Sequence, residues 1–530
     1  MRRDAIVLAA IVGAFAVAAA GAMRHTSTTF DEVLLPAAGA RGYASGEFNL
    51  VTDHPPFLQY VYGLPVYLAG ASYPPEIGWD YHSRYQYATT FYFASGNDPE
   101  RIAFIGRLPG IVIGALLIVA TFLFTRAAAG RIAGLLAAGL VAFLPDVLAH
   151  SGISYNDVPL ALVVLLATWA SDAAARDPRL QRIALAGAAT GLALGVKFSG
   201  IVMGPITLLL VLLEGARRWP DREWLRRVLV GLPVFAAAAY LVLVAIYLGD
   251  FAIRDFWVGL DFNIRHANRG HGAPAVLLGR YSETGWWYFF PVAFFLKTSV
   301  GLHVLMLVAL AGLLLAPVRD RWRDLATSPL RVPVVGGVVF LAFVMAANLN
   351  IGFRHALPLL PFVCILTAIG IARLLPLRLR FLRITVVAAF VWHILSPLRF
   401  YPFFMSYLSE YTGSVEYSYE ALVDSSLDWG QGLLELRDFM EEEDIPAVLL
   451  SYFGSAPPAG YGIRYVALPS FFPLPPHPAP PGDSLPRWIA ISATNLAGNY
   501  IGAEAFARFR DIEPHRVLAR SIFVFRLEDE

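Results

Sequence analysis

Long apolar segments recur along the whole chain and are separated by short polar stretches. A helix needs about 20 predominantly apolar residues to cross the roughly 30 Å hydrocarbon core of a bilayer. The pattern predicts about eleven transmembrane helices and hence an all-α polytopic membrane protein. The predicted spans, of which the pair around Lys197 is the shortest, are 5–22, 102–125, 132–150, 156–174, 183–197, 199–214, 228–249, 287–316, 333–349, 356–373 and 384–397.

The first span follows Arg2 and Arg3, which is compatible with either a signal peptide or a membrane anchor. A run of small residues near residue 20 resembles a cleavage site. The apolar run 5–22 is nevertheless longer than the roughly 7 to 15 residues of a signal-peptide core. We therefore expect an uncleaved first transmembrane helix.

Basic residues fall on alternate loops, and cytoplasmic loops carry the excess of Arg and Lys. On the same side as Arg2 and Arg3 are Arg126/Arg131, Arg176/Arg179/Arg182, Arg217/Arg218/Arg222/Arg226/Arg227, Arg319/Arg321/Arg323/Arg331 and Arg373/Arg378/Arg380/Arg383. The alternation predicts a multi-pass protein of the plasma (inner) membrane with a cytoplasmic amino terminus. The segments expected on the extracytoplasmic side are 24–100, 151–156, 250–286, 350–355 and 398–530.

The segment 398–530 differs from the remainder of the chain in its pattern. Its signals are a helical pattern at Leu433–Glu443 and β-like runs at 447–452, 488–492 and 520–527. It also contains the proline-rich stretch FFPLPPHPAPPGDSLP, which predicts a stiff linker. We expect a small extracytoplasmic α/β domain at 398–530, after a transmembrane domain at 1–397.

Composition excludes several classes of protein. The chain is 57% hydrophobic and only 15% charged, whereas about 25% of the residues in soluble domains are charged. The formal net charge of +1 is spread over short clusters, so no basic patch for nucleic acid is indicated. Cys364 is the one cysteine, which rules out an intramolecular disulfide and a thiol metal site.

Candidate chemistry gathers in the segment Thr28–Tyr60, directly after the first span. It contains the adjacent carboxylates Asp31 and Glu32, and a DHPP turn with Asp53 and His54. Adjacent side chains point in different directions, so a single base with a supporting neighbour is more economical than an acid and base acting on one bond. The alternative is a pair of solvated loop carboxylates.

Asp157 and Lys197 lie at the predicted extracytoplasmic ends of apolar segments. Asp157 precedes Val-Pro and either caps a helix or faces a cavity that binds a sugar or an acceptor. An ammonium group near the bilayer centre costs about 2.5 kcal/mol or more. Lys197 therefore either extends to the interface or binds phosphate. Lys297 allows the same two interpretations, with the interface favoured.

Arg354 and His355 begin another predicted helix on the same side. A helix N-terminus disfavours cations, so we expect Arg354 to have an anionic partner in the protein or a ligand. Further basic residues of the loop 250–286 are Arg265, His266, Arg269, His271 and Arg280. Together they favour an anionic, lipid-borne ligand. The sequence has no nucleotide-binding motif and no HExxH zinc motif.

Several motifs resemble those of a known superfamily. FDE after the first span, DHPPF, NDVPLAL, GLALGVKFSG and GFRHALPLLPF look like the GT-C glycosyltransferases that use polyprenyl-phosphate sugars. The most similar groups are relatives of protein O-mannosyltransferases and lipid A aminoarabinose transferases (glycosyltransferase families 39 and 83), and the resemblance covers about residues 1–400. DSSLDWGQGLLELRDFM resembles an outer domain of bacterial members and departs from the eukaryotic mannosyltransferases.

The resemblance implies a GT-C fold over 1–397 and inverting transfer of a sugar from a polyprenyl phosphate to a lipid, glycan or protein acceptor. It implies that Asp31 is the catalytic base and Glu32 its partner. A phosphate leaves readily without a protonating acid, so one base and several cations suffice. The candidate phosphate ligands are Lys197, Arg354 and Arg280. The candidate acceptor ligands are Asp53, His54, Asp157 and His355.

Two alternatives remain at this point: a transporter or flippase of lipid-linked saccharides, and a non-catalytic membrane scaffold. Transporters tend to show repeated halves and polar residues at broken helices in mid-membrane. Here the polar residues gather at the predicted outer ends, which favours an enzyme. No cofactor is indicated. Asp31, Glu32, Asp53, His54 and Asp157 are compatible with a divalent cation, but their spacing matches no defined ligand motif.

Overall fold

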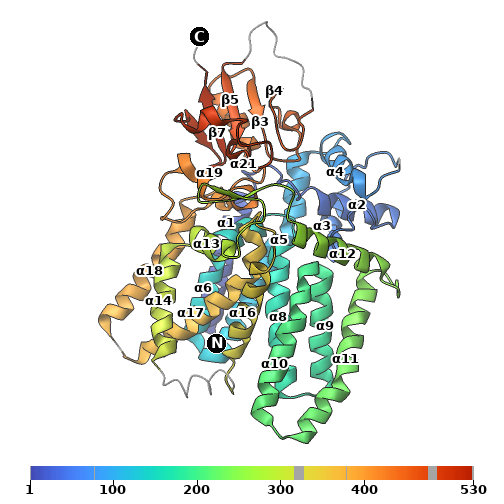
Figure 1. Ribbon diagram of the computed structural model, residues 1–530, viewed down its shortest axis with the longest axis vertical. Helices are drawn as coiled ribbons and strands as arrows, with labels where there is room; N and C mark the ends of the chain where they lie inside the picture. The colour runs from blue at the N-terminus through green and yellow to red at the C-terminus, as the bar shows by residue number, and fades with distance from the viewer. Residues whose placement is uncertain (1, 77, 316–326, 378, 476–485, 528–530) are drawn as a thin grey trace.

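The computed structural model describes residues 2–76, 78–315, 327–377, 379–475 and 486–527. It consists of a bundle of helices with a β-sheet at one end, and the amino terminus lies toward the opposite end (Figure 1). The end of the bundle that faces the sheet is called the sheet end below. Outside the described residues lie Arg319, Arg321, Arg323, Arg378 and part of the proline-rich stretch.

Within the described residues, seven helical segments are long and apolar enough to cross a membrane. They are α1 (Arg2–Ala22), α5 (Pro99–Ala129), α8 (Asp157–Arg176), η2 with α10 (Phe198–Arg218), α11 (Arg222–Ile246), η3 with α17 and η4 (Phe353–Leu377) and α18 (Arg380–Leu398). The chain is therefore a multi-pass membrane protein, and the predicted all-α transmembrane region is confirmed.

The predicted number of about eleven spans is reached only when shorter and bent helices are included. Two bent pairs raise the seven spans found in the described residues to as many as nine. The remaining two predicted spans correspond to α9 (Leu180–Val196) and α16 (Arg331–Met345), which have 17 and 15 residues. A transmembrane helix has about 17–25 residues, so α9 lies at the lower limit of this range and α16 falls below it.

The bent pairs correct two predicted spans. Within 132–150, α6 (Arg131–Ala142) and α7 (Pro145–Ser151) meet at 63°, because Pro145 cannot continue the preceding helix. Within 287–316, α13 (Phe289–Lys297) and α14 (Val300–Leu314) meet at 113°. There Ser299 accepts a hydrogen bond from the backbone N–H of Leu302 at 3.2 Å and so starts a new helix.

The segment 24–100 and the loop 250–286 contain short elements near the sheet end (Figure 1). The helices are α2 (Leu34–Ser45), α3 (Phe57–Leu68), α4 (Arg84–Phe93) and α12 (Arg254–Arg269). A two-stranded hairpin, β1 (Ala275–Leu277) and β2 (Arg280–Ser282), follows α12.

The carboxyl-terminal part forms a five-stranded sheet of order β4-β3-β5-β7-β6. Its strands are β3 (Val448–Ser451), β4 (Tyr465–Ala467), β5 (Trp488–Ser492), β6 (Arg516–Leu518) and β7 (Ile522–Arg526). Its helices are α19 (Ser418–Ala421), α20 (Leu433–Glu442), α21 (Ala493–Ala497) and α22 (Ala507–Arg510). The predicted α/β character is confirmed, although the predicted β-like runs included neither β4, which pairs with β3, nor β6, which pairs with β7.

Helix α9 packs directly on the backbone of α11 through glycines. A Cβ atom added at Gly187 would lie 2.3 Å from the carbonyl oxygen of Phe235, and one at Gly191 would lie 2.4 Å from that of Ala239. Glycines four residues apart allow such close approach between membrane helices. The contact matters for the site described below, because Lys197 directly follows α9.

We expect Gly191→Val to lower the thermal unfolding temperature in detergent, because forcing extra atoms into a packed contact costs about 1–3 kcal/mol. Gly204→Val is the matched control, since a Cβ atom at Gly204 in α10 meets no atom within 4 Å. Equal unfolding temperatures for the two variants would contradict the proposed packing.

Candidate active site

Asp31 lies at the sheet end, between α1 and α2, and its side chain is 19% exposed. Tyr85 donates a hydrogen bond to Oδ1 at 2.6 Å, and Tyr155 donates one to Oδ2 at 3.3 Å. Burial, followed by the nearby Asp31 carboxylate, raises the pKa of both phenols well above the usual value. The two tyrosines therefore stay protonated and fix a carboxylate that remains reachable.

Glu32 points away from Asp31, as expected for adjacent residues, and its side chain is only 1% exposed. Arg107 of α5 donates to both carboxylate oxygens, at 2.7 and 2.9 Å. The backbone N–H groups of Thr29 and Ser154 donate to it at 3.0 and 3.2 Å. Glu32 thus forms a buried ion pair with Arg107, and this pair connects the loop that carries Asp31 to α5. The predicted catalytic role of Glu32 stays a prediction.

Asp157 is buried at the start of α8 and contacts two cations. The Lys197 ammonium lies 2.6 Å from Oδ1, and the Arg354 guanidinium lies 3.4 Å from Oδ2. Asn156, not Asp157, is the N-cap of α8, and among the described residues the Asp157 carboxylate bonds Lys197 and Arg354 instead of capping the helix. Lys197 likewise forms an ion pair within the protein instead of extending to the interface.

Arg354 connects this ion pair to Asp31. Its Nη2 atom lies 3.7 Å from Oδ2 of Asp31, in addition to its contact with Asp157. The anionic partners that the helix-terminus argument predicted are therefore two carboxylates of the protein. Asp31, Asp157, Lys197 and Arg354 form one cluster, called the Asp31 cluster below.

The DHPP turn joins the Asp31 cluster through one phenol. The Nε2 atom of His54 lies 2.7 Å from the Tyr155 hydroxyl, which also bonds Asp31. Asp53 accepts a hydrogen bond from Tyr81 at 3.3 Å, and its carboxylate lies 3.7 Å from the Arg84 guanidinium. The predicted acceptor residues Asp53 and His54 therefore lie on one side of the Asp31 cluster.

Three further residues that the sequence singled out form no hydrogen bond or ion pair with the side chains of the Asp31 cluster in the described part of the chain. Arg280 is exposed on β2, and no contact of the described residues joins it to the Asp31 cluster. His355 follows Arg354, and its Nε2 atom is buried without a hydrogen-bond partner among the described residues. Lys297 does not reach the interface but is buried, because it donates to the carbonyls of Met405 and Ser426 at 2.6 and 2.7 Å.

Metal binding receives no support from the described residues, among which no group of three His, Cys, Asp or Glu side chains is arranged to hold a metal ion. The carboxylates of Asp31, Glu32 and Asp157 each contact an arginine or a lysine. Glu32 in particular bonds Arg107 and lies apart from Asp157, which bonds Lys197.

The segment 424–431 of the carboxyl-terminal part also belongs to the site, which the sequence did not predict. Ser425 accepts a hydrogen bond from Nε of Arg354 at 2.9 Å. The Trp429 ring centroid lies 4.2 Å from Cζ of Arg354, and the ring packs edge-on against Tyr155 at 5.3 Å. Segment 424–431 thus forms one wall around the guanidinium group. In the sequence, only the motif DSSLDWGQG marked this segment, and the motif did not predict which residues the segment would contact.

The same segment also holds the loop that carries Asp31. The backbone N–H of Phe30 donates to the Trp429 carbonyl at 2.8 Å, and that of Ser27 donates to the Gln431 carbonyl at 3.1 Å. Ser455 adds a hydrogen bond to the Phe30 carbonyl at 2.6 Å. The position of Asp31 therefore depends on the carboxyl-terminal part.

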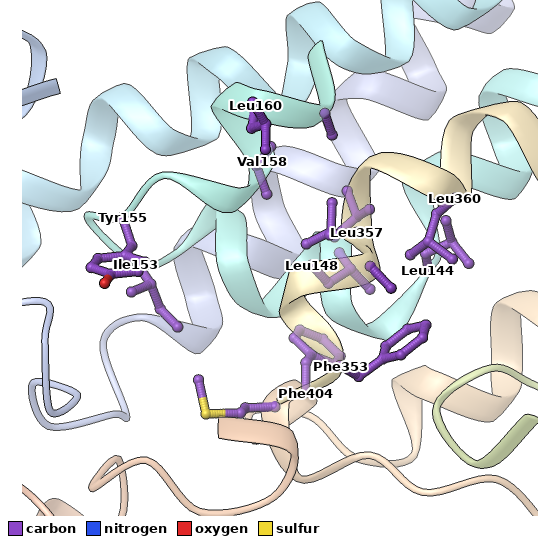
Figure 2. Close-up of a cluster of buried hydrophobic side chains, with 14 of the residues drawn as sticks. Leu144, Leu148, Ile153, Tyr155, Val158, Leu160, Phe353, Leu357, Leu360 and Phe404 are labelled. Carbon is purple, nitrogen blue, oxygen red and sulfur yellow. The ribbon is translucent and has the colours of Figure 1, made fainter. Parts of the chain in front are cut away.

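Apolar side chains from several elements form a buried cluster that includes Tyr155 (Figure 2). Tyr155 and Arg354 are each close in sequence to buried anchors of this apolar cluster. The anchors drawn there include Leu144, Leu148, Val158, Phe353, Leu357 and Phe404. Because these side chains are fixed, the guanidinium and phenol groups have few alternative positions.

We expect Arg107→Met to destabilise the protein by about 3–5 kcal/mol, because it leaves Glu32 buried without its ion-pair partner. The double variant Glu32→Gln/Arg107→Met removes both charges and should unfold at a higher temperature than Arg107→Met alone. Thermal unfolding in detergent measures both, with the exposed Arg101→Met on the same helix as control. A double variant less stable than Arg107→Met would contradict this account of the ion pair.

Comparisons with solved structures find similarity to membrane glycosyltransferases at low identity. ArnT from Cupriavidus metallidurans in the apo state aligns at 16% identity and a TM-score of 0.48, over 75% of this chain and 64% of that one, which is less than two thirds. ArnT from Cupriavidus metallidurans bound to undecaprenyl phosphate aligns at 13% identity and a TM-score of 0.48, over 98% of this chain and 97% of that one. A third structure is the archaeal oligosaccharyltransferase AglB from Archaeoglobus fulgidus in complex with an inhibitory peptide and a dolichol-phosphate. It aligns at 12% identity and a TM-score of 0.41, over 79% of this chain and 58% of that one.

Sequence comparisons give a family for one part of the chain. No curated protein sequence matches it. Residues 101–245 match the model of the dolichyl-phosphate-mannose-protein mannosyltransferase family. This stretch contains Arg107, Tyr155, Asp157 and Lys197. The resemblance to the GT-C glycosyltransferases that the sequence motifs predicted is confirmed by this family match over residues 101–245.

Proposed function

We propose that this protein is a membrane glycosyltransferase that moves a sugar from a polyprenyl-phosphate carrier to a lipid, glycan or protein acceptor. The observation that carries the proposal is the Asp31 cluster, in which a partly exposed carboxylate lies beside Arg354, with Lys197 joined through Asp157. One base and two cations are the groups that transfer from a phosphate-linked sugar requires. The family match over 101–245 supports the same chemistry.

Asp31 acts as the general base in this proposal. It removes the proton from an acceptor hydroxyl or amine as that oxygen or nitrogen attacks the anomeric carbon of the sugar. The bond between the anomeric carbon and the phosphate oxygen breaks, and the phosphate leaves with the electron pair. A single displacement of this kind inverts the anomeric configuration. Tyr85 and Tyr155 keep the carboxylate in place during the transfer.

Arg354 and Lys197 hold the phosphate and stabilise the charge that develops on it. Both cations contact Asp157, whose carboxylate offsets part of the repulsion between them. Asp53, His54, Asp157 and His355 remain proposed acceptor ligands. Arg280 remains a proposed phosphate ligand, although it is exposed on β2.

The site is proposed to face the extracytoplasmic side of the plasma membrane. The alternating basic clusters support a cytoplasmic amino terminus, which puts the sheet end and the segment 398–530 outside. A donor carried by a lipid suits this side of the membrane, where the site has little access to cytoplasmic nucleotides. We propose 1–397 as the catalytic transmembrane domain and 398–530 as its extracytoplasmic companion.

We propose that Trp429 is a positioning residue. Its ring lies on the Arg354 guanidinium, and its backbone carbonyl binds the Asp31 loop. It therefore acts on both the cation and the base without being required to touch the sugar. Ser425 fixes the other edge of the guanidinium.

Asp31→Asn should lower the rate of transfer about 100-fold or more, because it removes the base but keeps a side chain of the same shape. Release of undecaprenyl phosphate from a panel of synthetic undecaprenyl-phosphate sugars, measured by mass spectrometry, gives the rate. Asp438→Asn is the control, since Asp438 is exposed on α20. Full turnover by a folded Asp31→Asn protein would contradict the assignment of the base.

Trp429→Leu should lower kcat and weaken undecaprenyl phosphate binding about tenfold, because loss of the ring frees the Arg354 guanidinium. Trp429→Phe keeps an aromatic face and should retain most of the binding. The shift of thermal unfolding temperature caused by undecaprenyl phosphate reports the effect, and the exposed Trp287→Leu is the control. An unchanged shift in a folded Trp429→Leu protein would contradict the positioning role.

A further inference from the structure

A cavity of about 420 Å³ lies where α18 ends and the carboxyl-terminal part begins. Its walls come from the segment 399–418 and from the turn between β6 and β7. None of its lining residues belongs to the Asp31 cluster. The cavity is therefore separate from the candidate active site.

Two arginines that are far apart in sequence line this cavity. Arg399 is the first residue after α18, and Arg520 lies in the β6–β7 turn. Arg399 pairs with Glu410 at 3.2 Å. Arg520 lies within ion-pair distance of no described carboxylate, and its guanidinium rests over the Phe400 ring at 4.1 Å. Burial and then Arg399 lower the pKa of Arg520, as expected where like charges approach.

The carboxylates near these arginines do not neutralise both. Glu410 also accepts hydrogen bonds from Ser396 and Trp392, at 2.6 and 2.8 Å, so its carboxylate is held on the side of Arg399. Glu435 accepts a hydrogen bond from the backbone N–H of Ala519 at 2.6 Å and forms no ion pair with Arg520 among the described residues. The cavity consequently keeps an excess of positive charge.

The backbone that presents Arg520 is strained. Ala519 and Arg520 have φ values of 48° and 54°, in the left-handed region. Three residues, 519–521, connect Leu518 of β6 to its partner Ile522 of β7. Tight hairpin turns ordinarily have Asn or Gly at positions with positive φ, because these residues adopt such values at low cost. Strain of this sort persists at functional sites, where the local conformation serves a purpose beyond the turn itself. Here it places a guanidinium at the cavity wall.

A buried hydroxyl that lines the cavity has no hydrogen-bond partner among the described residues. Ser418 is 3% exposed, and its Oγ atom makes no hydrogen bond among the described residues. Buried polar groups are almost always hydrogen-bonded in proteins, directly or through a bound molecule. A ligand with several acceptor oxygens would satisfy Ser418 and both guanidinium groups together.

The cavity lies at the end of a membrane-spanning helix. Trp392 on α18 and Tyr401 just after it are 41% and 47% exposed. Exposed Trp and Tyr mark the level of lipid headgroups in membrane proteins. The position therefore favours a ligand that belongs to the membrane over one dissolved in water.

We propose that this cavity binds the phosphate headgroup of an anionic membrane lipid. Arg399 contributes from a membrane helix, Arg520 from the sheet, and Ser418 from the segment between them. A bound headgroup would bridge α18 and the carboxyl-terminal part, and so hold the sheet against the membrane surface. The proposal does not depend on the identity of the sugar or on the role of Asp31.

The test is native mass spectrometry of the full chain in detergent, titrated with phosphatidylglycerol. Arg520→Gln should reduce the bound lipid about tenfold, because a charge-assisted phosphate contact is lost. Arg520→Lys should restore part of the binding. Arg508→Gln, on α22 and outside the cavity, is the matched control and should bind like the wild type.

Phosphatidylcholine and inorganic phosphate complete the experiment. Zwitterionic phosphatidylcholine should be retained less than phosphatidylglycerol, and inorganic phosphate alone should be retained weakly. Equal retention of phosphatidylglycerol by the wild type and a folded Arg520→Gln protein would overturn the proposal. Retention of inorganic phosphate without retention of phosphatidylglycerol would also overturn it, since the ligand would then be free phosphate.

Discussion

The guanidinium group of Arg354 joins three parts of the chain that build the site. It approaches Asp31 after the first membrane helix, Asp157 at the start of α8, and Ser425 and Trp429 in the carboxyl-terminal part. A buried cation is stable only when its charge and its donors are matched, so these segments must come together for the charge to be buried. The same requirement places a base and a phosphate-binding cation side by side.

This constraint gives the carboxyl-terminal part a role in the fold of the site. Trp429 contacts Arg354 through its ring and the Asp31 loop through its backbone. Lys297 adds a buried link, because its ammonium binds the carbonyls of Met405 and Ser426. A protein whose active-site loop is fixed by a distant segment couples the membrane helices to the sheet. Binding at either part can therefore affect the other.

The membrane helices and the strands β3, β5 and β7 follow periodic patterns, and these were predictable from the sequence, whereas the three-residue strands β4 and β6 were not. The sequence predicted that Arg354 has an anionic partner, because a helix N-terminus disfavours cations. It did not predict which carboxylate that partner would be. The partners of Glu32 and Arg354 were not predictable, because Arg107 lies 75 positions from Glu32 and Ser425 lies 71 positions from Arg354. Pairing over such distances depends on helix packing, which local patterns do not encode.

A structure of the protein with undecaprenyl phosphate, determined by cryo-electron microscopy, tests the central claim most directly. The account predicts that the phosphate lies within hydrogen-bond distance of Arg354 and Lys197, on the side of the Asp31 carboxylate. A phosphate bound elsewhere, with Lys197 and Arg354 contacting only the carboxylates of the protein, would contradict it.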